Sequence, residues 1–520
     1  MKKTVIKATI AWISTVIILA CASGIWLSLP QGNLQDKPLD AQGKKPVQSA
    51  LSVAATAQNT VALCPVLPSG EKSQTVVAAL SQHREAPKGS YRTMGADTLA
   101  LAPYGNGYVS AATLTDVQSG TLEVEPVKNS PSLGIGLSYS VVGEKKPSLQ
   151  VGQCATPVSS AWFIGASTKI GSTSELVLTN PSTVAVTVQL SAFDHIGPIS
   201  DTHGDMTIAP QTTQSVRLDA RYPQTDGLAV HVQASGAGII AALKTEESQG
   251  LTSLGADFIS PAAPPMPQVT IPAVRLGNSD QKLRIVNPQA QPVTASVFVI
   301  DKAKKKVLPG ADSISVSAQA VQDISLDYVE PGLYSLVIEA DKPVTAAAKL
   351  VISPEIEKTA ASDQRLLSTD KPSDDSKDRD ITPSERDFTW SPAVEAQTSG
   401  VVIVPKDMPT TFVGATLTPT QIHFEAPGRS DNSAGNAHAN DDAHSDSGKQ
   451  GINDTPGQQN VINVKAQAPA TLQPGIWIWA SQTPVSLGGI AATADNKGIA
   501  YIPGFVSARE ATTIDIRIVP

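Results

Sequence analysis

The densest group of side chains that could bind a metal lies late in the chain. It comprises His438, Asp441, Asp442, His444 and Asp446. Imidazole and carboxylate groups are ordinary metal ligands, but the spacing is not that of an EF-hand calcium loop. The surrounding residues 426–457 have low-complexity composition, and ordering a free loop around an ion costs about 1–2 kcal/mol per residue. We therefore expect a solvated insertion that binds neither a metal nor a cofactor.

Nucleophile motifs give no stronger signal. Ser279 and Lys282 form an S-x-x-K pattern, but this pattern needs both an S-D-N and a K-T-G companion for its chemistry, and K-T-G does not occur. Motifs of the G-x-S-x-G, phosphate-loop and H-E-x-x-H types are also missing from the sequence. The sequence therefore predicts no catalytic residues, and we expect a protein that is not an enzyme.

Two tryptophans could bind a ligand by stacking. Trp477 and Trp479 are two residues apart, so they share one face of a strand. Burial in a hydrophobic core is one interpretation of this pair. The other is an exposed pair that stacks on a sugar ring or on a partner protein.

Three cysteines limit the redox chemistry. Cys21 lies in an apolar segment, which leaves Cys64 and Cys154. An even number of cysteines in an oxidising compartment indicates a disulfide, whereas two buried free thiols are the alternative. Neither cysteine has another Cys or His at metal-ligand spacing. We therefore predict a Cys64–Cys154 disulfide.

The N-terminal segment predicts export. Lys2, Lys3 and Lys7 precede the uncharged residues 8–29, which as a helix would span roughly 33 Å, enough for a hydrocarbon core. The lysines favour a single-pass plasma-membrane anchor with the following chain outside the cytoplasm. A cleaved signal peptide ending near Ala20–Ala22, or lipidation at Cys21, is the alternative. Each of the three exports the rest of the chain.

Composition favours short strands over long helices. The chain has 520 residues, of which only 4% are aromatic, and it contains 37 Gly and 39 Pro. These values are typical of β-strands with many turns and of several domains. The formal net charge is −8, which argues against a nucleic-acid partner because that function needs clustered positive charge.

An internal repeat organises the middle of the chain. "SELVLTNPSTVAVTVQLSAFD" begins at Ser174, and "QKLRIVNPQAQPVTASVFVID" begins at Gln281. Leu176 matches Leu283 at an offset of 107, and later segments match at offsets of 108 and 105. The apolar positions alternate, as in strands with one buried face, and Asn-Pro followed by Val-Thr predicts a hairpin. The repeat therefore predicts two sandwiches with buried leucines.

These patterns predict an all-β chain of tandem immunoglobulin-like β-sandwiches after an N-terminal transmembrane helix. A weaker third copy follows the two repeats. The expected segments are an anchor or signal at 1–30, a disordered stalk at 31–60, an N-terminal β-domain at 61–154, repeats at 155–260 and 268–352, a disordered acidic linker at 353–390, and a third sandwich-like domain at 391–520 with the insertion 426–457.

Short motifs resemble one protein family. Cys64-Pro65, the Ala161-Trp162 segment with Gly165, and the Leu-x-Leu-x-Asn-Pro strand end at residues 176–181 are similar to those of the actinobacterial membrane-anchored family known as domain of unknown function 5719. The resemblance implies an exported envelope protein and carries no known activity or site. Gly165-Ala166 departs from the Gly-Gly that members often have after the tryptophan.

The function we expect follows from a repeat that preserves core and turn positions. We expect a non-catalytic, extracytoplasmic envelope protein that scaffolds or binds, anchored in the membrane through residues 8–29. Its partners would be envelope proteins or cell-wall polymer. The alternatives are a cell-wall-acting enzyme with a dispersed site and a surface adhesin. Two carboxylates with raised pKa values in a deep pocket would favour the enzyme.

Overall fold

The computed structural model describes residues 57–506, strand β1 (Leu51–Val53) and strand β36 (Ile514–Ile516). The gaps are 69, 71, 82, 84, 94–96, 106–107, 116–118, 143–147, 302–303, 354–385 and 428–460. The predicted anchor, the histidine–aspartate cluster and most of the predicted stalk and linker lie outside the described residues. Within the described residues, no helix is long and apolar enough to cross a membrane.

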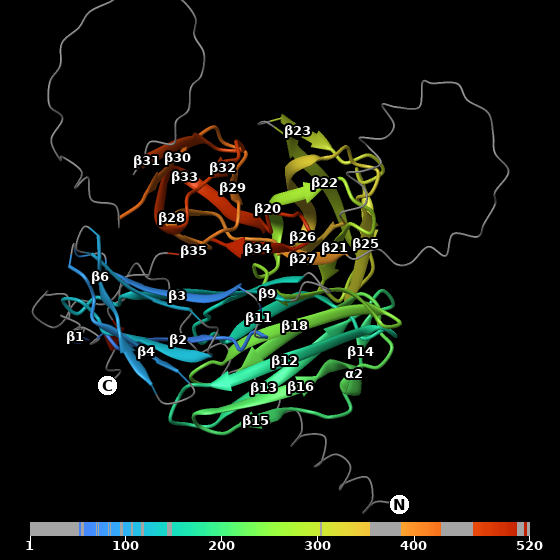
Figure 1. Cartoon of the computed structure of the whole chain (residues 1–520). Helices are drawn as coiled ribbons and strands as arrows, with labels where there is room; N and C mark the ends of the chain where they lie inside the picture. The colour runs from blue at the N-terminus through green and yellow to red at the C-terminus, as the bar shows by residue number, and fades with distance from the viewer. Residues whose placement is uncertain are drawn as a thin grey trace, which may run out of the picture. The chain divides into compact units, whose positions relative to one another are not determined.

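The chain divides into two units. In the smaller unit, Met1–Ala55 with Thr512–Pro520, strands β1 and β36 pair antiparallel. The larger unit, Thr56–Ala511, contains every site discussed below, and its described residues are all-β apart from one short helix. Figure 1 shows its strands coloured in chain order from blue to red.

The first part of the larger unit has two antiparallel sheets; we call it copy one, because its strand pairing recurs in three later parts. In each copy we call the sheet whose last strand lies at the centre of the unit the inner sheet, and the other the outer sheet. In copy one the outer sheet has the order β2-β8-β4-β5, and the inner sheet has the order β10-β9-β3-β7-β6. Its strands are β2 (Thr60–Cys64), β3 (Lys72–Leu80), β4 (Gly89–Thr93), β5 (Thr98–Ala100), β6 (Ala102–Tyr104), β7 (Val109–Leu114), β8 (Gly120–Val124), β9 (Leu133–Val142) and β10 (Ser148–Gln153).

Copy two has an outer sheet, β11-β17-β13-β14 with β15, and an inner sheet, β16-β12-β18-β19. Both sheets contribute to one hydrophobic core. Its elements are β11 (Ser160–Ala166), β12 (Ser172–Asn180), β13 (Val186–Phe193), β14 (Pro198–Ile199), β15 (Met206–Ile208), β16 (Thr212–Arg217), α2 (Leu218–Arg221), β17 (Leu228–Ala234), β18 (Ile240–Gln249) and β19 (Thr252–Ile259).

Copy three contains one long strand that belongs to both of its sheets. The first half of β26 pairs with β20 and β22, and its second half pairs with β21 and β27. The strands are β20 (Met266–Leu276), β21 (Lys282–Asn287), β22 (Val293–Asp301), β23 (Lys304–Val307), β24 (Ile314–Val316), β25 (Ala320–Ser325), β26 (Gly332–Ile352) and β27 (Asp387–Pro392).

Copy four repeats this plan with β33 as its long strand. Its first half pairs with β28 and β30, and its second half pairs with β29 and β34. The strands are β28 (Gln397–Val404), β29 (Thr410–Ala415), β30 (Gln421–Glu425), β31 (Val461–Lys465), β32 (Ala470–Thr471), β33 (Gly475–Ala492), β34 (Ile499–Pro503) and β35 (Phe505–Val506).

Strand pairing reproduces the sequence repeat residue by residue. Leu176 of β12 lies opposite Val216 and Leu243. Leu283 of β21 lies opposite Ile324 and Ala348. These neighbours differ by the offsets of 108 and 105 found in the sequence. Leu176 and Leu283 are both fully buried, as the alternating pattern predicts.

The same pairing also occurs in the first and last copies. Strand β3 pairs with β7 and β9, as β12 pairs with β16 and β18, and β29 pairs with β32 and β33. The larger unit is therefore built from four copies of one strand topology. The sequence predicted two copies and a weaker third, and it described copy one only as a β-domain.

The repeated Asn-Pro motif joins two sheets and does not form the predicted hairpin. Strand β12 lies in the inner sheet and β13 in the outer sheet, with no pairing between them. Asn180 is fully buried and donates to the carbonyls of Val184 and Ile208 at 2.7 and 3.1 Å. Asn287 makes the equivalent bonds in copy three, to Gln291 and Val316. The asparagine thus fixes the crossing between sheets.

The strand order differs from the predicted immunoglobulin order. In that fold the last two strands lie side by side in one sheet. Here β17 lies in the outer sheet, and the next strand, β18, lies in the inner sheet beside β12. Alternating hydrophobicity indicates which face of a strand is buried, but it does not indicate which strand lies next to it in the sheet. The all-β prediction is confirmed, whereas the immunoglobulin order is wrong.

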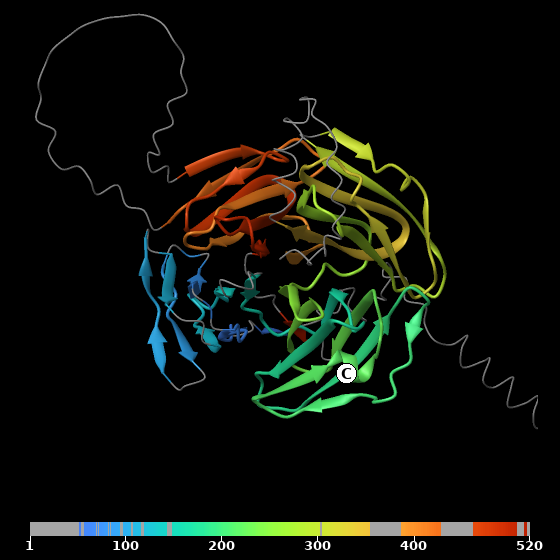
Figure 2. The ribbon, with the colours of Figure 1, turned by 45° about the vertical axis from the view of Figure 1, so that its right-hand side comes forward.

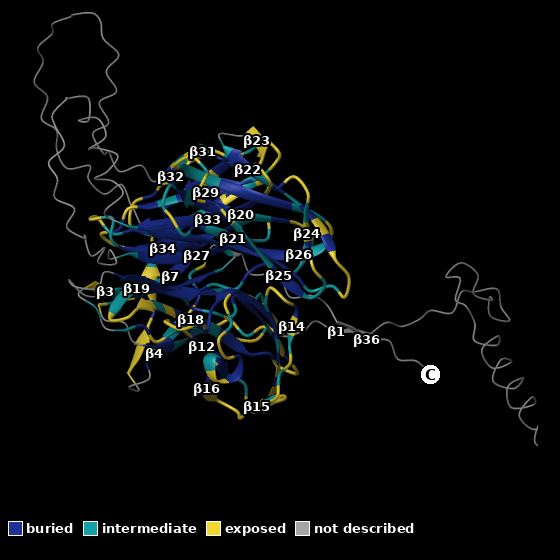
Figure 3. Cartoon of the chain, turned by 90° about the vertical axis from the view of Figure 1, so that its right-hand side faces the viewer, coloured by how far each residue is buried: buried dark blue, intermediate teal, exposed yellow. Residues whose placement is uncertain are grey.

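The last strand of each inner sheet lies at a common centre. Strand β19 contacts β10 and β27, and β34 contacts the same two strands. In Figure 2 the sheets of the four copies follow one another around this centre. Strands β27 and β34 are buried along their whole lengths, as their dark blue colour in Figure 3 shows.

Strand β27 corrects one predicted boundary. The acidic linker was expected to extend to residue 390, yet Asp387–Pro392 forms the innermost strand of copy three. Asp387 has no exposed surface. Its charge suggested solvent exposure in the sequence, but its carboxylate is bonded to backbone amides at the centre of the unit.

Candidate binding site

A cavity of about 450 Å³ lies between copies one and two. We call the boundary between consecutive copies a seam, and we call this cavity the seam pocket. Its volume falls in the range of small-molecule and side-chain sites. Its lining is mostly carbon, which separates it from the more open cavities between copies three and four and over β30 and β31.

The floor of the seam pocket is the inner sheet of copy two. Side chains on a strand alternate between its two faces. Leu176 and Leu178 of β12 therefore point into the core of copy two, where both are fully buried. The intervening residues of β12 and the alternate residues of β18 face the pocket. They are Glu175, Val177, Thr179, Ile240, Ala242 and Lys244.

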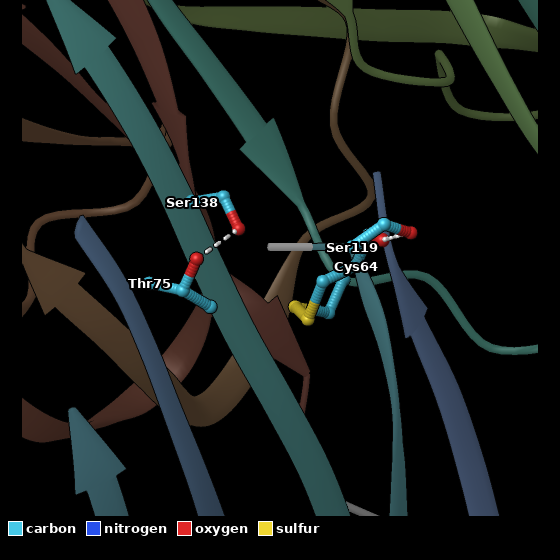
Figure 4. Close-up of a disulfide and its surroundings, with 5 residues drawn as sticks. Cys64, Thr75, Ser119 and Ser138 are labelled. Atoms are coloured by element: carbon cyan, nitrogen blue, oxygen red, sulfur yellow. Dashed lines mark hydrogen bonds between the residues drawn. A yellow bond between two sulfur atoms is a disulfide. The ribbon is translucent and has the colours of Figure 1, made fainter. Parts of the chain in front are cut away.

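The roof comes from copy one next to the disulfide. Leu63 and the segment 65–68 line it, with Val66 65% exposed at its rim. Cys64 and Cys154 form the predicted disulfide, which closes a span of 90 residues. Ser119 donates a hydrogen bond to the Cys64 carbonyl at 2.9 Å (Figure 4). The disulfide and this bond hold the start of the roof in place.

Charged groups in the floor do not neutralise one another directly. Glu175 lies opposite Lys244 and Arg217 on the neighbouring strands. Lys244 forms an ion pair with Glu246 at 2.5 Å, and Arg217 forms one with Asp219 at 2.9 Å. The pocket therefore has apolar walls and one half-buried carboxylate, that of Glu175. The neighbouring Lys244 and Arg217 form their ion pairs with other carboxylates.

The next seam shows what fills the equivalent space. Val177 corresponds to Arg284 in copy three, and Ser215 corresponds to Asp323, by the offsets of the repeat. Arg284 is 1% exposed and donates to both carboxylate oxygens of Asp323, at 2.7 and 2.9 Å. It also donates across the seam to the Ala166 carbonyl. An ion pair thus fills this seam, whereas a valine and a serine leave the seam pocket open.

Further contacts close the filled seam. Lys349 corresponds to Lys244 and pairs with Glu247 of copy two at 2.9 Å. Gly165 has a φ of +138°, and a Cβ there would lie 2.6 Å from the Trp390 ring. A glycine is needed because the backbone conformation disfavours other residues and the indole leaves no room. This contact explains why a glycine occupies position 165, which is one of the residues that carry the family resemblance.

Two buried carboxylates lie at the centre of the unit. Asp387 accepts hydrogen bonds from the backbone amides of Leu149 and Ile499, at 2.9 and 3.1 Å. Asp257 accepts bonds from the Trp390 amide and the Thr389 hydroxyl, at 2.9 and 3.1 Å. Each carboxylate therefore bonds to at least one strand of a different copy.

Burial changes the ionisation of both groups. It raises the pKa of Asp257 to about 7. Burial also raises the pKa of Asp387 well above its usual value, and the nearby charge of Asp257 adds to this effect. Raised carboxylate pKa values are found in enzymes that use a general acid. However, neither side chain lines the seam pocket or either of the two other cavities named above, and both side chains are buried.

The tryptophan pair is buried. Trp477 and Trp479 are 1% and 2% exposed and belong to the core of copy four. The Trp477 indole donates to the Gln473 carbonyl at 2.8 Å. Their shared strand face was predicted, but neither ring is available for stacking on a ligand. The interpretation of Trp477 and Trp479 as a ligand-stacking pair is therefore wrong, because that face of the strand is the core face.

The sequence did not identify the seam pocket. Its floor consists of ordinary strand residues whose outward positions look solvated when one copy is read alone. Aligning the repeats gives a usable signal, because Val177 and Ser215 match Arg284 and Asp323. The uncharged pair in copy two and the charged pair at the same positions in copy three indicate that the two seams are filled differently.

Comparison with known proteins identifies a family. The model described as "Family of unknown function (DUF5719)" matches residues 128–448, which is more than half of the chain. The matched range contains the whole floor of the seam pocket, whereas the roof from Leu63 to Pro68 precedes it. No curated protein matches the chain.

Proposed function

We propose that this chain, which belongs to the DUF5719 family of unknown function, is a non-catalytic envelope protein that binds a partner in the seam pocket. The observation that carries this proposal is the contrast between seams. The same structural position is filled by a buried ion pair in one seam and is open, apolar and about 450 Å³ in volume in another. An apolar group entering the open seam would be removed from water without displacing a paired charge.

Features of the sequence support an extracytoplasmic location. Residues 8–29 form an uncharged segment after three lysines, as in a membrane anchor that leaves the following chain outside the cytoplasm. The Cys64–Cys154 disulfide fits an oxidising compartment. The proposal is therefore a single-pass plasma-membrane protein whose sheets face envelope proteins or cell-wall polymer.

A cell-wall-acting enzyme is the second candidate. Asp257 and Asp387 favour it because their pKa values are raised, as expected of catalytic acids. Burial argues against it, because each side chain is at most 2% exposed and bonded to backbone amides of neighbouring strands. These contacts support a structural role, with the seam pocket as the binding site.

Replacing Ala242 with tryptophan tests the pocket. Ala242 lies in the floor, so an indole there would fill much of the cavity. We expect the wild-type chain to bind the apolar fluorophore anilinonaphthalene sulfonate saturably. Ala242→Trp should weaken this binding by about tenfold or more, as loss of roughly 1.4 kcal/mol requires. Fluorescence titration measures the effect.

Thr187→Trp provides the matched control. Thr187 is exposed on β13 of the same copy, in the sheet that does not face the seam. This variant adds the same indole and should bind the fluorophore as the wild type does. Equal binding by Ala242→Trp and the wild type would contradict the assignment of the seam pocket as the binding site.

A further inference from the structure

Strand β16 is an unpaired edge beside the seam pocket. It ends the inner sheet of copy two, and among the described strands it pairs with β12 alone. Five of its six residues are exposed, and Figure 3 shows the strand at the surface. Thr213 and Ser215 of this strand line the pocket. An exposed edge offers a row of backbone donors and acceptors to any extended segment that can reach it.

The equivalent edge in copy three is covered. Strand β25 occupies the position of β16, and Val321 corresponds to Thr213. The Val321 amide donates to the Asp194 carbonyl of copy two at 2.8 Å. The edge of β25 is therefore bonded to the backbone of the preceding copy. At the edge of β16, by contrast, no described backbone group outside the β12 ladder bonds to Thr213 or Ser215.

The register identifies which amides of β16 face outward. Val321 lies opposite Val286, yet its amide points away from β21 to reach Asp194. Thr213 lies opposite Thr179 in the same register. Because antiparallel pairs alternate between bonded and non-bonded residues, the amides of Thr213 and Ser215 also point away from β12. These outward amides lie next to an apolar cavity.

We propose that an extended segment of a partner protein adds to β16 as a further strand and places an apolar side chain in the seam pocket. This inference rests on the proposed function, and it specifies the partner as a peptide segment in β-conformation. Backbone bonds to an edge strand supply affinity, and pockets for alternate side chains supply specificity. Copy three supports this occupant, because an outward amide of the equivalent edge, that of Val321, already bonds to a backbone carbonyl.

Selection from a phage library of random peptides on the full chain supplies the probe. Peptides that bind should carry apolar residues at alternate positions. Ser215→Pro removes an outward amide without removing a bond to β12, so the sheet should persist. We expect it to weaken binding of the selected peptide by about tenfold or more, whereas Gln214→Ala, which keeps the outward amides and changes an exposed residue outside the pocket lining, should bind like the wild type.

N-methylation of the selected peptide gives a second test that leaves the protein unchanged. Methylating alternate amides, those that would face β16, should abolish binding, and methylating the intervening amides should not. Equal effects of both methylation patterns, or binding unaffected by Ser215→Pro, would overturn strand addition. If Ala242→Trp still blocks the fluorophore in that case, the pocket assignment stands and only strand addition fails.

Discussion

Replacing Asp257 with asparagine should stabilise the chain at about pH 8 by roughly 2–4 kcal/mol. Burial raises the pKa of Asp257 from 3.8 to about 7, so the folded chain holds this proton more tightly than the unfolded chain does. Stability therefore falls as the pH rises from 3.8 to about 7. Asparagine carries no charge and can still accept the hydrogen bond from the Trp390 amide. Urea unfolding measures the change.

The pH dependence separates this charge effect from packing. At about pH 3 the wild-type carboxyl is protonated in both the folded and the unfolded chain, so Asp257→Asn should change the unfolding free energy little. Asp205→Asn is the control, because Asp205 is exposed, and a surface change of this kind alters stability by less than about 0.5 kcal/mol. A stabilisation by Asp257→Asn of the same size at both pH values would show that ionisation is not the cause.

Replacing Arg284 with alanine should destabilise the chain by about 3–5 kcal/mol, because it leaves a largely buried partner without its main cation. Burial alone would raise the pKa of Asp323. The hydrogen bonds and charge of Arg284, together with Lys282, outweigh burial and hold this pKa well below its usual value. The guanidinium also lies 4.9 Å from the centre of the Trp390 ring. Urea unfolding at neutral pH measures this loss.

Two comparisons identify the buried pair as the cause. Lys305→Ala removes a more exposed pair with Glu339, and it should reduce stability by less than about 1 kcal/mol. The double variant Arg284→Ala, Asp323→Ala should be less destabilised than the sum of the two single variants, since it leaves no unpaired charge. Additive losses would instead mean that the two side chains act independently.

The sequence predicted which strand positions are buried, because this follows from alternating hydrophobicity. Leu176 and Leu283 were expected in cores and are fully buried there. The cysteine pairing was also predicted, because Cys64 and Cys154 are the two cysteines outside the apolar segment. Strand neighbours could not be predicted in the same way, because pairing depends on contacts between residues far apart in the chain.

Copy one and strand β27 show why other parts were missed. Copy one has the same pairing as copy two, but its sequence does not preserve the Asn-Pro motif. Asp387 was counted with the solvated acidic residues of the linker, although its carboxylate is bonded inside the unit. A buried charge cannot be recognised from composition, since its partners are backbone amides supplied by other copies.

The seam pocket could not be predicted from a single copy. Its floor residues face away from the core of copy two, so they have the character of surface positions. The pocket exists because copy one covers this face through the segment 65–68. Only the contrast between Val177 and Arg284 at matched positions indicates that two seams differ, and reading that contrast requires knowing that both face a neighbouring copy.

Photo-cross-linking in intact cells tests binding at the seam pocket most directly. A photoreactive residue would replace either Val66, 65% exposed at the pocket rim, or Leu251, 98% exposed in the β18–β19 turn. We predict a discrete cross-linked product from position 66 that is absent from position 251 and disappears when Ala242→Trp is added. Identical products from both positions, or a product from position 66 that Ala242→Trp does not diminish, would contradict the account.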